Sequence, residues 1–416
     1  MTLSIPGGPR QGRVRIPSSK SAAQRLLLCA ALSERGCTLS CDGISRDLAA
    51  MIDCLRALGA SVCVEGASIR VVPVRAAAEG ELLLPCGESG AALRFLLPVV
   101  GALGARTLFT REGTLPCRPL APLSSELVRH GMTIETEGAA LRVSGRLRGG
   151  DWVLPGDVSS QFVSALLMAL PLLEEDSRLS LTTPLQSAPY VALTEQTLRQ
   201  CALRLEKDGE SWLIPGGQRP SPPSALKIEG DWSNAAVFLA MGALSDGGVA
   251  VEGLDPDSVQ GDRAVLALLE RFGAKCERTD SGARVRRGTL RGIRFDASQI
   301  PDLVPPLAAL AALAEGETRI ENAARLRAKE SDRLQSLTLL LAALGADARQ
   351  TDDTLVIRGA PTLPGGAAES FGDHRIAMAA AVAACGCTGA AELRGAECVE
   401  KSYPRFWDDF GSLGGL

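Results

Sequence analysis

Six short polar clusters each open an alanine- and leucine-rich segment in which apolar residues recur with helical spacing. They recur about every 70 residues: Lys20-Ser21, Ser89-Gly90, Ser159-Ser160, Ser233-Asn234, Pro301-Asp302 and Asp373-His374. A short β-like run follows each segment, as at 106–109, 178–181 and 317–320. A fixed period of this length predicts one supersecondary unit copied six times.

A second amphipathic helix and a pair of alternating strands complete the repeat. Residues 47–59 have helical spacing and end on a glycine, and residues 61–65 and 69–74 then alternate as strands. The same pattern, a helix followed by a strand, recurs at 263–273 and 275–278 and at 333–345 and 347–349. A looser copy lies at 126–131 and 133–135. The pattern predicts six βαβαββ units.

Two segments indicate crossings between lobes. Residues 10–17 join an N-terminal strand to the first repeat, and the proline-rich residues 218–224 resemble a linker. Residues 225–229 then predict a strand that leads into the fourth repeat. We therefore expect an α/β protein with an N-terminal lobe (18–228) and a C-terminal lobe (1–17 plus 229–416). The first strand is returned to the C-terminal lobe, and a hinge lies near Pro17 and Ile228.

Composition narrows the class of protein. A chain of 416 residues favours two domains, and a net charge of −4 with 4% aromatic residues argues against a general nucleic-acid or anionic-membrane surface. The 12 cysteines are scattered, except for the pair Cys385 and Cys387, whose spacing does not suit a zinc site. The first residues lack the pattern of a signal peptide, and 376–391 is too short to span a bilayer. We expect a cytoplasmic protein with reduced cysteines and without a metal or cofactor.

The cluster openings are candidate anion sites, because helix N-termini carry free N–H groups and a positive dipole end. Lys20, Ser21 and Arg25 have the spacing to bracket one phosphate or carboxylate, although a capped helix with exposed cations is the simpler alternative. Gly90 lets an anion approach the backbone, and the Ser159–Gln161 opening offers neutral donors. Ordinary capping explains both openings equally well.

The second half of the chain holds the denser charge clusters. Asp302 follows Pro301 at a helix start, where a carboxylate either caps the helix or acts as a general base. Residues 325–333 are mostly charged and directly precede an apolar helix. Asp373, His374 and Arg375 open an almost wholly apolar helix, which is hard to explain as surface decoration.

These motifs together resemble the EPSP synthase (3-phosphoshikimate 1-carboxyvinyltransferase) family along the whole chain. The resemblance is carried, in order, by Pro17-Ser-Ser-Lys-Ser-Ala-Ala-Gln-Arg25, Leu326-Arg-Ala-Lys-Glu-Ser-Asp-Arg333, Gly372-Asp-His-Arg375 and Lys401-Ser-Tyr-Pro404. It implies a two-lobed inside-out α/β barrel, in which each lobe has three βαβαββ repeats around a pseudo-threefold axis. It also implies transfer of the enolpyruvyl group of phosphoenolpyruvate to the 5-hydroxyl of shikimate 3-phosphate by addition and elimination.

The resemblance further implies a role for individual residues. Asp302, Glu330 and Lys20 would be catalytic. Shikimate 3-phosphate would be bound by Lys20, Ser21, Arg25, Ser159, Ser160, Gln161, Ser187, Tyr190, Asp302 and Lys329. Phosphoenolpyruvate would be bound by Lys20, Gly90, Arg118, Gln161, Arg333, Arg375 and Lys401. No cofactor or metal is implied, and the partners are these two small molecules, with no nucleic acid or membrane and a monomeric chain.

Two positions depart from the family's common pattern. Residues 88–92 read Glu-Ser-Gly-Ala-Ala where many members have Asn-Ala-Gly-Thr-Ala, and the additional carboxylate of Glu88 bears on affinity for the inhibitor glyphosate. Arg325 stands where many members carry Asn, four residues before Lys329, so that contact is not transferred to this chain.

Two other readings compete with this one. UDP-N-acetylglucosamine enolpyruvyl transferases share the fold and phosphoenolpyruvate, and Cys117 beside Arg118 matches a reactive loop cysteine of that family. Ser21, Arg25 and the run at 329–333 favour the shikimate-type enzyme instead. A non-catalytic protein that binds RNA or nucleotide phosphates would need a basic face with aromatic side chains, which this acidic, aromatic-poor chain does not favour.

The predicted lobes generate a first test. Each lobe carries several cations at positive helix ends, so binding of a dianionic phosphate ester should draw the lobes together about the hinge. We expect the radius of gyration in small-angle scattering to fall when shikimate 3-phosphate is added. An unchanged radius with the ligand demonstrably bound would refute closure.

Overall fold

The computed structural model describes residues 1–75 and 80–414. The chain divides into two compact units. The N-terminal unit is Ser18–Ile228, and the C-terminal unit combines Met1–Pro17 with Glu229–Leu416, its last described residue being Gly414.

The N-terminal unit contains three sheets built in the same way. Each consists of a parallel pair of strands followed by an antiparallel hairpin. The strand orders are β14 (Ala225–Lys227), β3 (Cys37–Ser40), β5 (Ser68–Val72), β4 (Ser61–Glu65); β6 (Glu81–Pro85), β7 (Arg106–Thr110), β9 (Ala140–Gly145), β8 (Met132–Glu137); and β10 (Gly150–Leu154), β11 (Ser177–Leu181), β13 (Ser211–Ile214), β12 (Glu206–Asp208). Its helices are α1 (Lys20–Ala31), α2 (Arg46–Ala57), α3 (Gly90–Leu103), α4 (Leu123–Arg129), α5 (Ser160–Ala169) and α6 (Ala188–Gln200), with 3₁₀ turns η1 (Leu115–Cys117) and η2 (Leu170–Leu172).

The C-terminal unit repeats this plan twice and then varies it. Two sheets have the orders β16 (Lys275–Thr279), β17 (Gly282–Arg286), β15 (Val249–Glu252), β2 (Gly12–Arg15) and β18 (Arg294–Asp296), β19 (Glu317–Glu321), β21 (Leu355–Arg358), β20 (Asp347–Gln350). The third is β1 (Thr2–Ile5), β23 (Ala391–Arg394), β22 (Gly366–Glu369). The helices are α7 (Trp232–Ala243), α8 (Val265–Phe272), α9 (Val304–Ala311), α10 (Arg333–Ala343), α11 (His374–Ala384) and α12 (Phe406–Ser412), with 3₁₀ turns η3 (Gly261–Ala264), η4 (Pro301–Leu303), η5 (Ala324–Ala328) and η6 (Ala396–Lys401).

The predicted repeat is confirmed with one exception. The sixth copy has the parallel strands β22 and β23 joined by α11, but no hairpin follows β23 in the described chain. Strand β1 from the N-terminus takes the antiparallel place instead, with Thr2 opposite Arg394. The free edge of β23 is thereby covered by the start of the chain.

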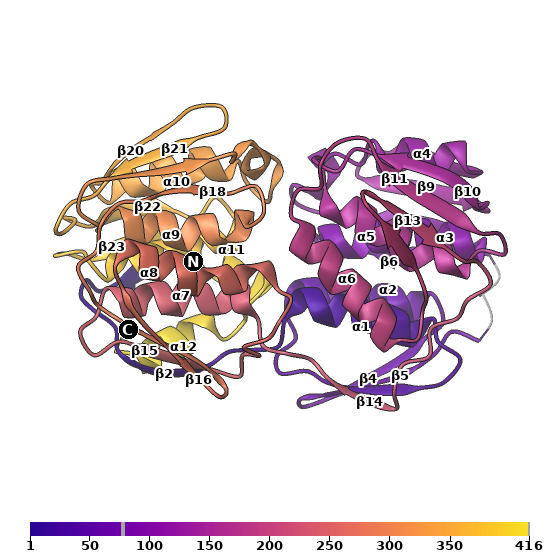
Figure 1. Cartoon of the computed structure of the whole chain (residues 1–416), viewed down its shortest axis with the longest axis horizontal. Helices are drawn as coiled ribbons and strands as arrows, with labels where there is room; N and C mark the ends of the chain where they lie inside the picture. The colour runs from indigo at the N-terminus through magenta and orange to yellow at the C-terminus, as the bar shows by residue number, and fades with distance from the viewer. Residues whose placement is uncertain (76–79, 415–416) are drawn as a thin grey trace. The chain divides into compact units, whose positions relative to one another are not determined.

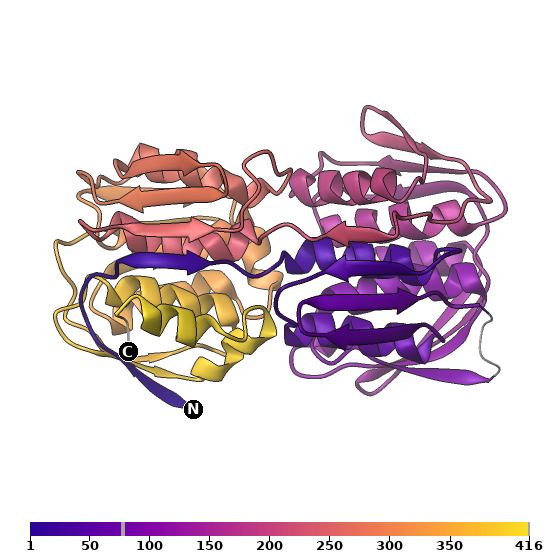
Figure 2. The same ribbon diagram turned by 90° about the horizontal axis from the view of Figure 1, so that it is seen from below.

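Two strands are exchanged between distant parts of the sequence. Strand β2 pairs in parallel with β15 of the fourth repeat, and β14 pairs in parallel with β3 of the first repeat, as Figure 2 shows. The strand predicted at 225–229 is present as β14 and precedes α7 of the fourth repeat, but it pairs within the sheet of the first repeat. The proline-rich residues 218–224 connect β13 with β14 inside one unit, so the chain does not leave that unit there.

The first helix of each repeat in the C-terminal unit is buried on every side. All residues of α7, α9 and α11 are buried, and these three helices contact one another with the sheets around them (Figure 1). A helix that is apolar all round is stable only in such a position. The polar residues that open these helices thus lie at the ends of buried helices.

Side-chain caps define most of these openings. Ser19, Ser89, Ser159, Asp231 and Asp373 each accept a hydrogen bond from a backbone N–H of the helix that follows. The fifth repeat differs, because a 3₁₀ turn with Ile300 at its N-cap position precedes α9. Asp302 lies inside that turn and does not occupy the N-cap position.

The exchanged strand generates a second test. A fragment of residues 18–228 retains β14, whereas a fragment of residues 18–223 loses it, together with the bonds from Thr38 N to Ser224 O (2.9 Å) and from Ile228 N to Ser40 O (3.0 Å). At about 1 kcal/mol for each bond and 2–4 °C per kcal/mol, we expect the shorter fragment to melt several degrees lower. Circular dichroism on both fragments measures this difference, and equal melting temperatures would show that β14 contributes nothing to stability.

Candidate active site

Arg25 is the centre of the polar cluster in the N-terminal unit. Its guanidinium is 2% exposed and donates from Nε to Thr194 Oγ1 (2.7 Å), and from its terminal nitrogens to the carbonyls of Ser21 (2.8 Å) and Tyr190 (3.1 Å). The Phe95 ring lies under it at 5.0 Å. Burial lowers the pKa of Arg25 to about 10, so it stays charged at neutral pH. Because these hydrogen-bond acceptors are neutral oxygens, they orient the charge without cancelling it.

Lys20 opens α1 and forms an ion pair with Asp47 at the start of α2. The distance from Lys20 Nζ to Asp47 Oδ2 is 2.8 Å. Gln24 joins this pair to the next repeat, because its amide nitrogen donates to the Asp47 carbonyl (3.1 Å) and to Ser89 Oγ (3.2 Å). The openings of the first and second repeats are thereby held together.

A second bond links the second and third repeats. Arg94 donates to Gln161 Oε1 at 2.6 Å and to the Pro119 carbonyl at 3.1 Å. In this contact the carbonyl oxygen of the Gln161 amide is the acceptor. Arg118 lies directly over Gly90, since a Cβ at Gly90 would be 2.9 Å from Arg118 Nη1. A side chain at position 90 would require the end of the Arg118 side chain to move.

The other predicted site residues of this unit lie at the starts of α5 and α6. Ser159 caps α5 by accepting from Gln161 N (3.3 Å), and the next residue, Ser160, is buried. Ser187 is buried before α6 with φ of 54°, a left-handed conformation that is uncommon for serine. Tyr190 follows one turn later and supplies its carbonyl to Arg25. Left-handed backbone conformations of residues other than glycine, such as that of Ser187, are frequent at ligand sites.

Glu88 is directed at the neighbouring loop. A Cβ placed on Gly113 would be 2.4 Å from Glu88 Oε1, so the carboxylate packs against that glycine. The sequence expectation that Glu88 changes the affinity for glyphosate stays a prediction.

Arg333 is the centre of the cluster in the C-terminal unit. It is 1% exposed and forms ion pairs with Asp373 (Nε to Oδ2, 2.8 Å), Asp302 (Nη1 to Oδ1, 2.8 Å) and Glu330 (Nη2 to Oε2, 2.7 Å). Burial on its own would lower the pKa of Arg333, but the three carboxylates outweigh burial and raise it. One guanidinium therefore holds acids from η4, from the residues before α10 and from the start of α11.

Asp302 is in turn surrounded by cations. Its Oδ1 lies 2.8 Å from Arg333 Nη1, 3.5 Å from Arg375 Nε and 3.6 Å from Lys329 Nζ. Burial favours the neutral acid, but Arg375, Lys329 and Arg333 hold the pKa of Asp302 well below its ordinary value. Asp302 therefore does not cap the helix but forms ion pairs, and its role as a general base stays a prediction.

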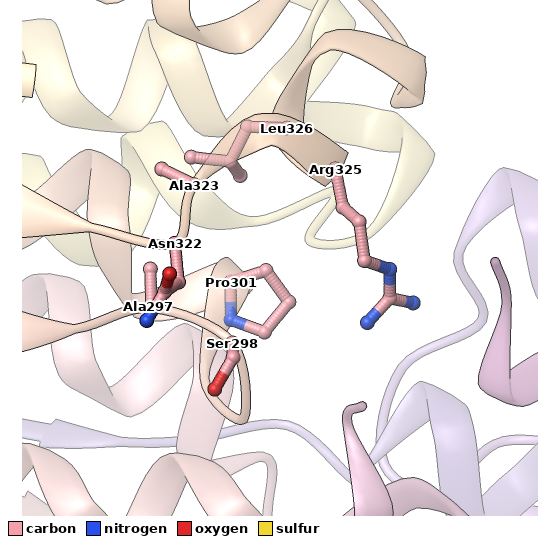
Figure 3. A pocket seen from close by; sticks show the side chains of 7 residues that line it. All are labelled: Ala297, Ser298, Pro301, Asn322, Ala323, Arg325 and Leu326. Carbon is pink, nitrogen blue, oxygen red and sulfur yellow. The ribbon is translucent and has the colours of Figure 1, made fainter. Parts of the chain in front are cut away.

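Lys329 and Arg325 extend this cluster along η5. Burial is the main reason that the pKa of Lys329 is lowered to about 8, and the charges of Arg333 and Arg325 act in the same direction. Arg325 lines a shallow hollow beside Pro301, and its guanidinium points away from Ala323 and Leu326 (Figure 3). The complete lining is Ala297, Ser298, Pro301, Asn322, Ala323, Arg325 and Leu326.

Arg375 and Lys401 supply two further buried cations. Arg375, in the first turn of α11, donates from Nη2 to Ser233 Oγ (2.5 Å) and from Nη1 to the Asp302 carbonyl (3.4 Å). Lys401 ends η6 and is 5% exposed. Within the C-terminal unit, Asp302, Lys329, Glu330, Arg333 and Arg375 form one connected cluster.

Several members of these clusters were not selected from the sequence. Asp47, Thr194 and Asp262 are buried polar residues that contact or face the predicted residues. Asp47 stands in the first turn of α2, a position that gives a weak signal. Thr194 lies inside α6, where no sequence pattern marks it.

No group of three or more His, Cys, Asp or Glu residues in ranges 1–75 and 80–414 has the arrangement of a metal site. In the same ranges, no helix has the length and apolarity needed to cross a membrane.

The chain is similar to known proteins along nearly its whole length. The family model for EPSP synthase (3-phosphoshikimate 1-carboxyvinyltransferase) matches residues 5–410. The 3-phosphoshikimate 1-carboxyvinyltransferase of Clostridium kluyveri is 40% identical over 415 residues, which are 99% of this chain and 97% of that protein. The enzyme of Methanocorpusculum labreanum is 36% identical over 419 residues, which are 100% and 99% of the two chains.

The chain belongs to the EPSP synthase family.

Solved structures support the fold. An EPSP synthase from Acinetobacter baumannii matches with a TM-score of 0.82 at 26% identity, over 100% of this chain and 98% of the other. The enolpyruvyl transferase NikO from Streptomyces tendae has a TM-score of 0.80 at 22% identity, over 100% and 98%, which shows a shared fold. The predicted inside-out α/β fold, family and shikimate-pathway activity are confirmed.

The lowered pKa of Lys329 generates a third test. If Lys329 binds substrate as a cation, kcat/KM for shikimate 3-phosphate should fall as pH rises through about 8, because the free enzyme then loses this charge. In Lys329→Arg the charge persists, so the fall should move to higher pH. Lys207→Arg, at an exposed lysine, is the matched control. An unchanged profile in Lys329→Arg would assign the titration to another group.

Proposed function

We propose how the side chains of this EPSP synthase family member divide the work of the reaction. Its enzyme activity is that of a 3-phosphoshikimate 1-carboxyvinyltransferase, and the family implies shikimate 3-phosphate and phosphoenolpyruvate as substrates. The observation that carries the proposal is the Asp302 carboxylate, which lies within ion-pair distance of Lys329, Arg333 and Arg375. An acid among cations suits a reaction that moves a proton beside several substrate anions.

Shikimate 3-phosphate is assigned to the cluster around Arg25. Arg25 is buried and charged, and its bonding partners are neutral, so a phosphate dianion gains a direct charge partner there. Ser21 at the first turn of α1 and the buried Ser187 lie on the elements that supply carbonyls to Arg25. The proposed set is Lys20, Ser21, Arg25, Ser159, Ser160, Gln161, Ser187, Tyr190, Asp302 and Lys329.

Phosphoenolpyruvate is assigned to the arginines with fork geometry. Arg118 lies over the helix start at Gly90, and Arg333 and Arg375 lie beside Asp302. Planar guanidinium groups match carboxylate and phosphate oxygens two at a time. The proposed set is Lys20, Gly90, Arg118, Gln161, Arg333, Arg375 and Lys401.

Asp302 is proposed as the base that takes the proton of the 5-hydroxyl. In the free protein the surrounding cations hold its pKa low, which makes it a weak base. The anions of phosphoenolpyruvate would share Arg333, Arg375 and the neighbouring cations, and the pKa of Asp302 would then rise. Binding of the second substrate thus strengthens the base at the moment it is needed.

Glu330 and Lys20 are proposed to move the proton of the methylene group. As the 5-hydroxyl oxygen bonds to C2 of phosphoenolpyruvate, C3 gains a proton and becomes a methyl group. Phosphate then leaves C2 as the methyl group loses a proton, which restores the double bond. Glu330 is held by Arg333 and Lys20 by Asp47, so both groups are fixed before reaction.

The state of the protein in the cell completes the proposal. We place the enzyme in the cytoplasm as a monomer, consistent with a reaction whose two substrates are small soluble anions. Size-exclusion chromatography with light scattering gives the mass directly, and a stable dimer would contradict the monomeric assignment.

Asp302→Asn is the fourth test. The amide keeps the size of the side chain, and Arg333 retains Asp373 and Glu330, so the melting temperature should change little. Loss of the base should reduce kcat by roughly 10²–10⁴-fold in an assay of phosphate release. A near-normal kcat would remove Asp302 from the proton transfer.

The same assay tests which acceptor substrate is used and whether Cys117 is required, as the UDP-N-acetylglucosamine reading would predict. Phosphate release with shikimate 3-phosphate and none with UDP-N-acetylglucosamine is expected. Cys117→Ser, at an exposed thiol, should retain activity within about tenfold, or 1.4 kcal/mol of transition-state free energy. Turnover only with the nucleotide sugar, or complete loss in Cys117→Ser with an intact fold, would overturn the assignment.

A further inference from the structure

Asp262 is a buried acid next to the Arg333 cluster of the C-terminal unit. The proposed reaction does not involve it. It lies in η3 and is 4% exposed. Neighbouring Gln260 fixes this turn against the start of α7, because its amide accepts from Trp232 N (3.2 Å) and donates to the Gly230 carbonyl (2.9 Å). Gln260 thereby ties the turn that carries Asp262 to the backbone on both sides of Asp231, the N-cap of α7.

Ser233 connects Asp262 with Arg375. Ser233 Oγ accepts a hydrogen bond from Arg375 Nη2 at 2.5 Å and forms a side-chain hydrogen bond with Asp262. A hydroxyl has one proton, and an ionised carboxylate can only accept. Ser233 therefore donates to Asp262 and turns a lone pair towards Arg375. The three residues form a series of two hydrogen bonds. The guanidinium donates to the hydroxyl, and the hydroxyl donates to the carboxylate.

We propose that Asp262, acting through Ser233, is a positioning residue that holds the Arg375 guanidinium in the orientation required to bind the carboxylate or phosphate of phosphoenolpyruvate. The inference rests on the assignment of Arg375 to that substrate. Asp262 touches neither substrate, so it acts only through the arginine.

The geometry around Arg375 shows why such support matters. Its contacts with Asp302 are long, at 3.5 Å to the carboxylate and 3.4 Å to the carbonyl, whereas the bond to Ser233 is 2.5 Å. A long side chain loses much rotamer freedom on binding unless it is already ordered. The hydrogen bond to Ser233, supported by Asp262, orders the guanidinium through Nη2, whereas the contacts with Asp302 involve Nε and Nη1.

Asp262 also supplies charge that depends on pH. Burial raises the pKa of Asp262 to about 6, the carboxylates of Asp302 and Asp231 act in the same direction, and Arg375 and Ser233 oppose them. These four groups come from η4, α11 and the start of α7. Above about pH 6 Asp262 is ionised and can only accept, so Ser233 must donate to it. Below about pH 6 the carboxyl group is protonated and no longer fixes which group donates.

Steady-state kinetics on three variants tests the proposal. In Asp262→Asn and Ser233→Ala we expect KM for phosphoenolpyruvate to rise about tenfold, while kcat and KM for shikimate 3-phosphate change less than about threefold. In Ser233→Thr the hydroxyl is kept and KM should return towards the original value. Ser177→Ala, at a buried serine of β11, is the matched control.

The pH profile separates positioning from a merely structural role. In the unaltered enzyme, KM for phosphoenolpyruvate should rise as pH falls below about 6, and this rise should be absent in Asp262→Asn. An unchanged KM in Ser233→Ala, or equal losses in both KM values together with a lower melting temperature, would overturn the proposal. If Asp262→Asn does not fold, the comparison of Ser233→Ala with Ser233→Thr decides alone.

Arg375→Lys distinguishes failure of this inference from failure of the substrate assignment. A raised KM for phosphoenolpyruvate in Arg375→Lys, with no change in Ser233→Ala, would leave the assignment standing and remove the chain from Asp262. An unchanged KM in Arg375→Lys would overturn the assignment and the inference together. If the inference is correct, the rise in KM for phosphoenolpyruvate in the double variant of Arg375→Lys and Ser233→Ala should be smaller than the product of the rises in the two single variants.

Discussion

The buried guanidinium of Arg333 is the interaction on which the chemistry of the C-terminal unit depends. Three carboxylates surround it at 2.7–2.8 Å, and it is 1% exposed. Removing the guanidinium would leave three neighbouring carboxylates without their shared cation, which is strongly destabilising. The network therefore cannot rearrange freely, and it fixes Asp302 and Glu330, the two acids proposed to move protons, relative to one another.

The two units solve the problem of buried charge in different ways. Arg25 in the N-terminal unit is held by hydroxyl and carbonyl oxygens, and its charge stays available to an anion. Arg333 is held by acids, and its charge is mostly compensated before any ligand arrives. This contrast fits a phosphate site at Arg25, where binding strength matters, and a reacting site at Asp302, where the balance of charge sets basicity.

The repeat architecture explains how such charges become buried at all. In each repeat a polar cluster lies at the start of an apolar helix, and five of these starts are capped by Ser or Asp side chains. In the fifth repeat a 3₁₀ turn replaces the capped start. That departure frees the Asp302 carboxylate from capping and places it beside Arg333, so a local irregularity in the repeat coincides with the proposed base.

The sequence by itself determined the number of repeats, the family and most charged members of both clusters. Periodicity of apolar residues and the motif at 326–333 are local signals, so both are readable from the chain. Only the tertiary structure decided that β14 pairs with β3 and that β1 completes the last sheet, because strand pairing depends on distant partners. It also decided that Asp47 pairs with Lys20 and that Ser233 joins Asp262 to Arg375. These contacts join residues far apart in the chain, and their spacing leaves no periodic trace.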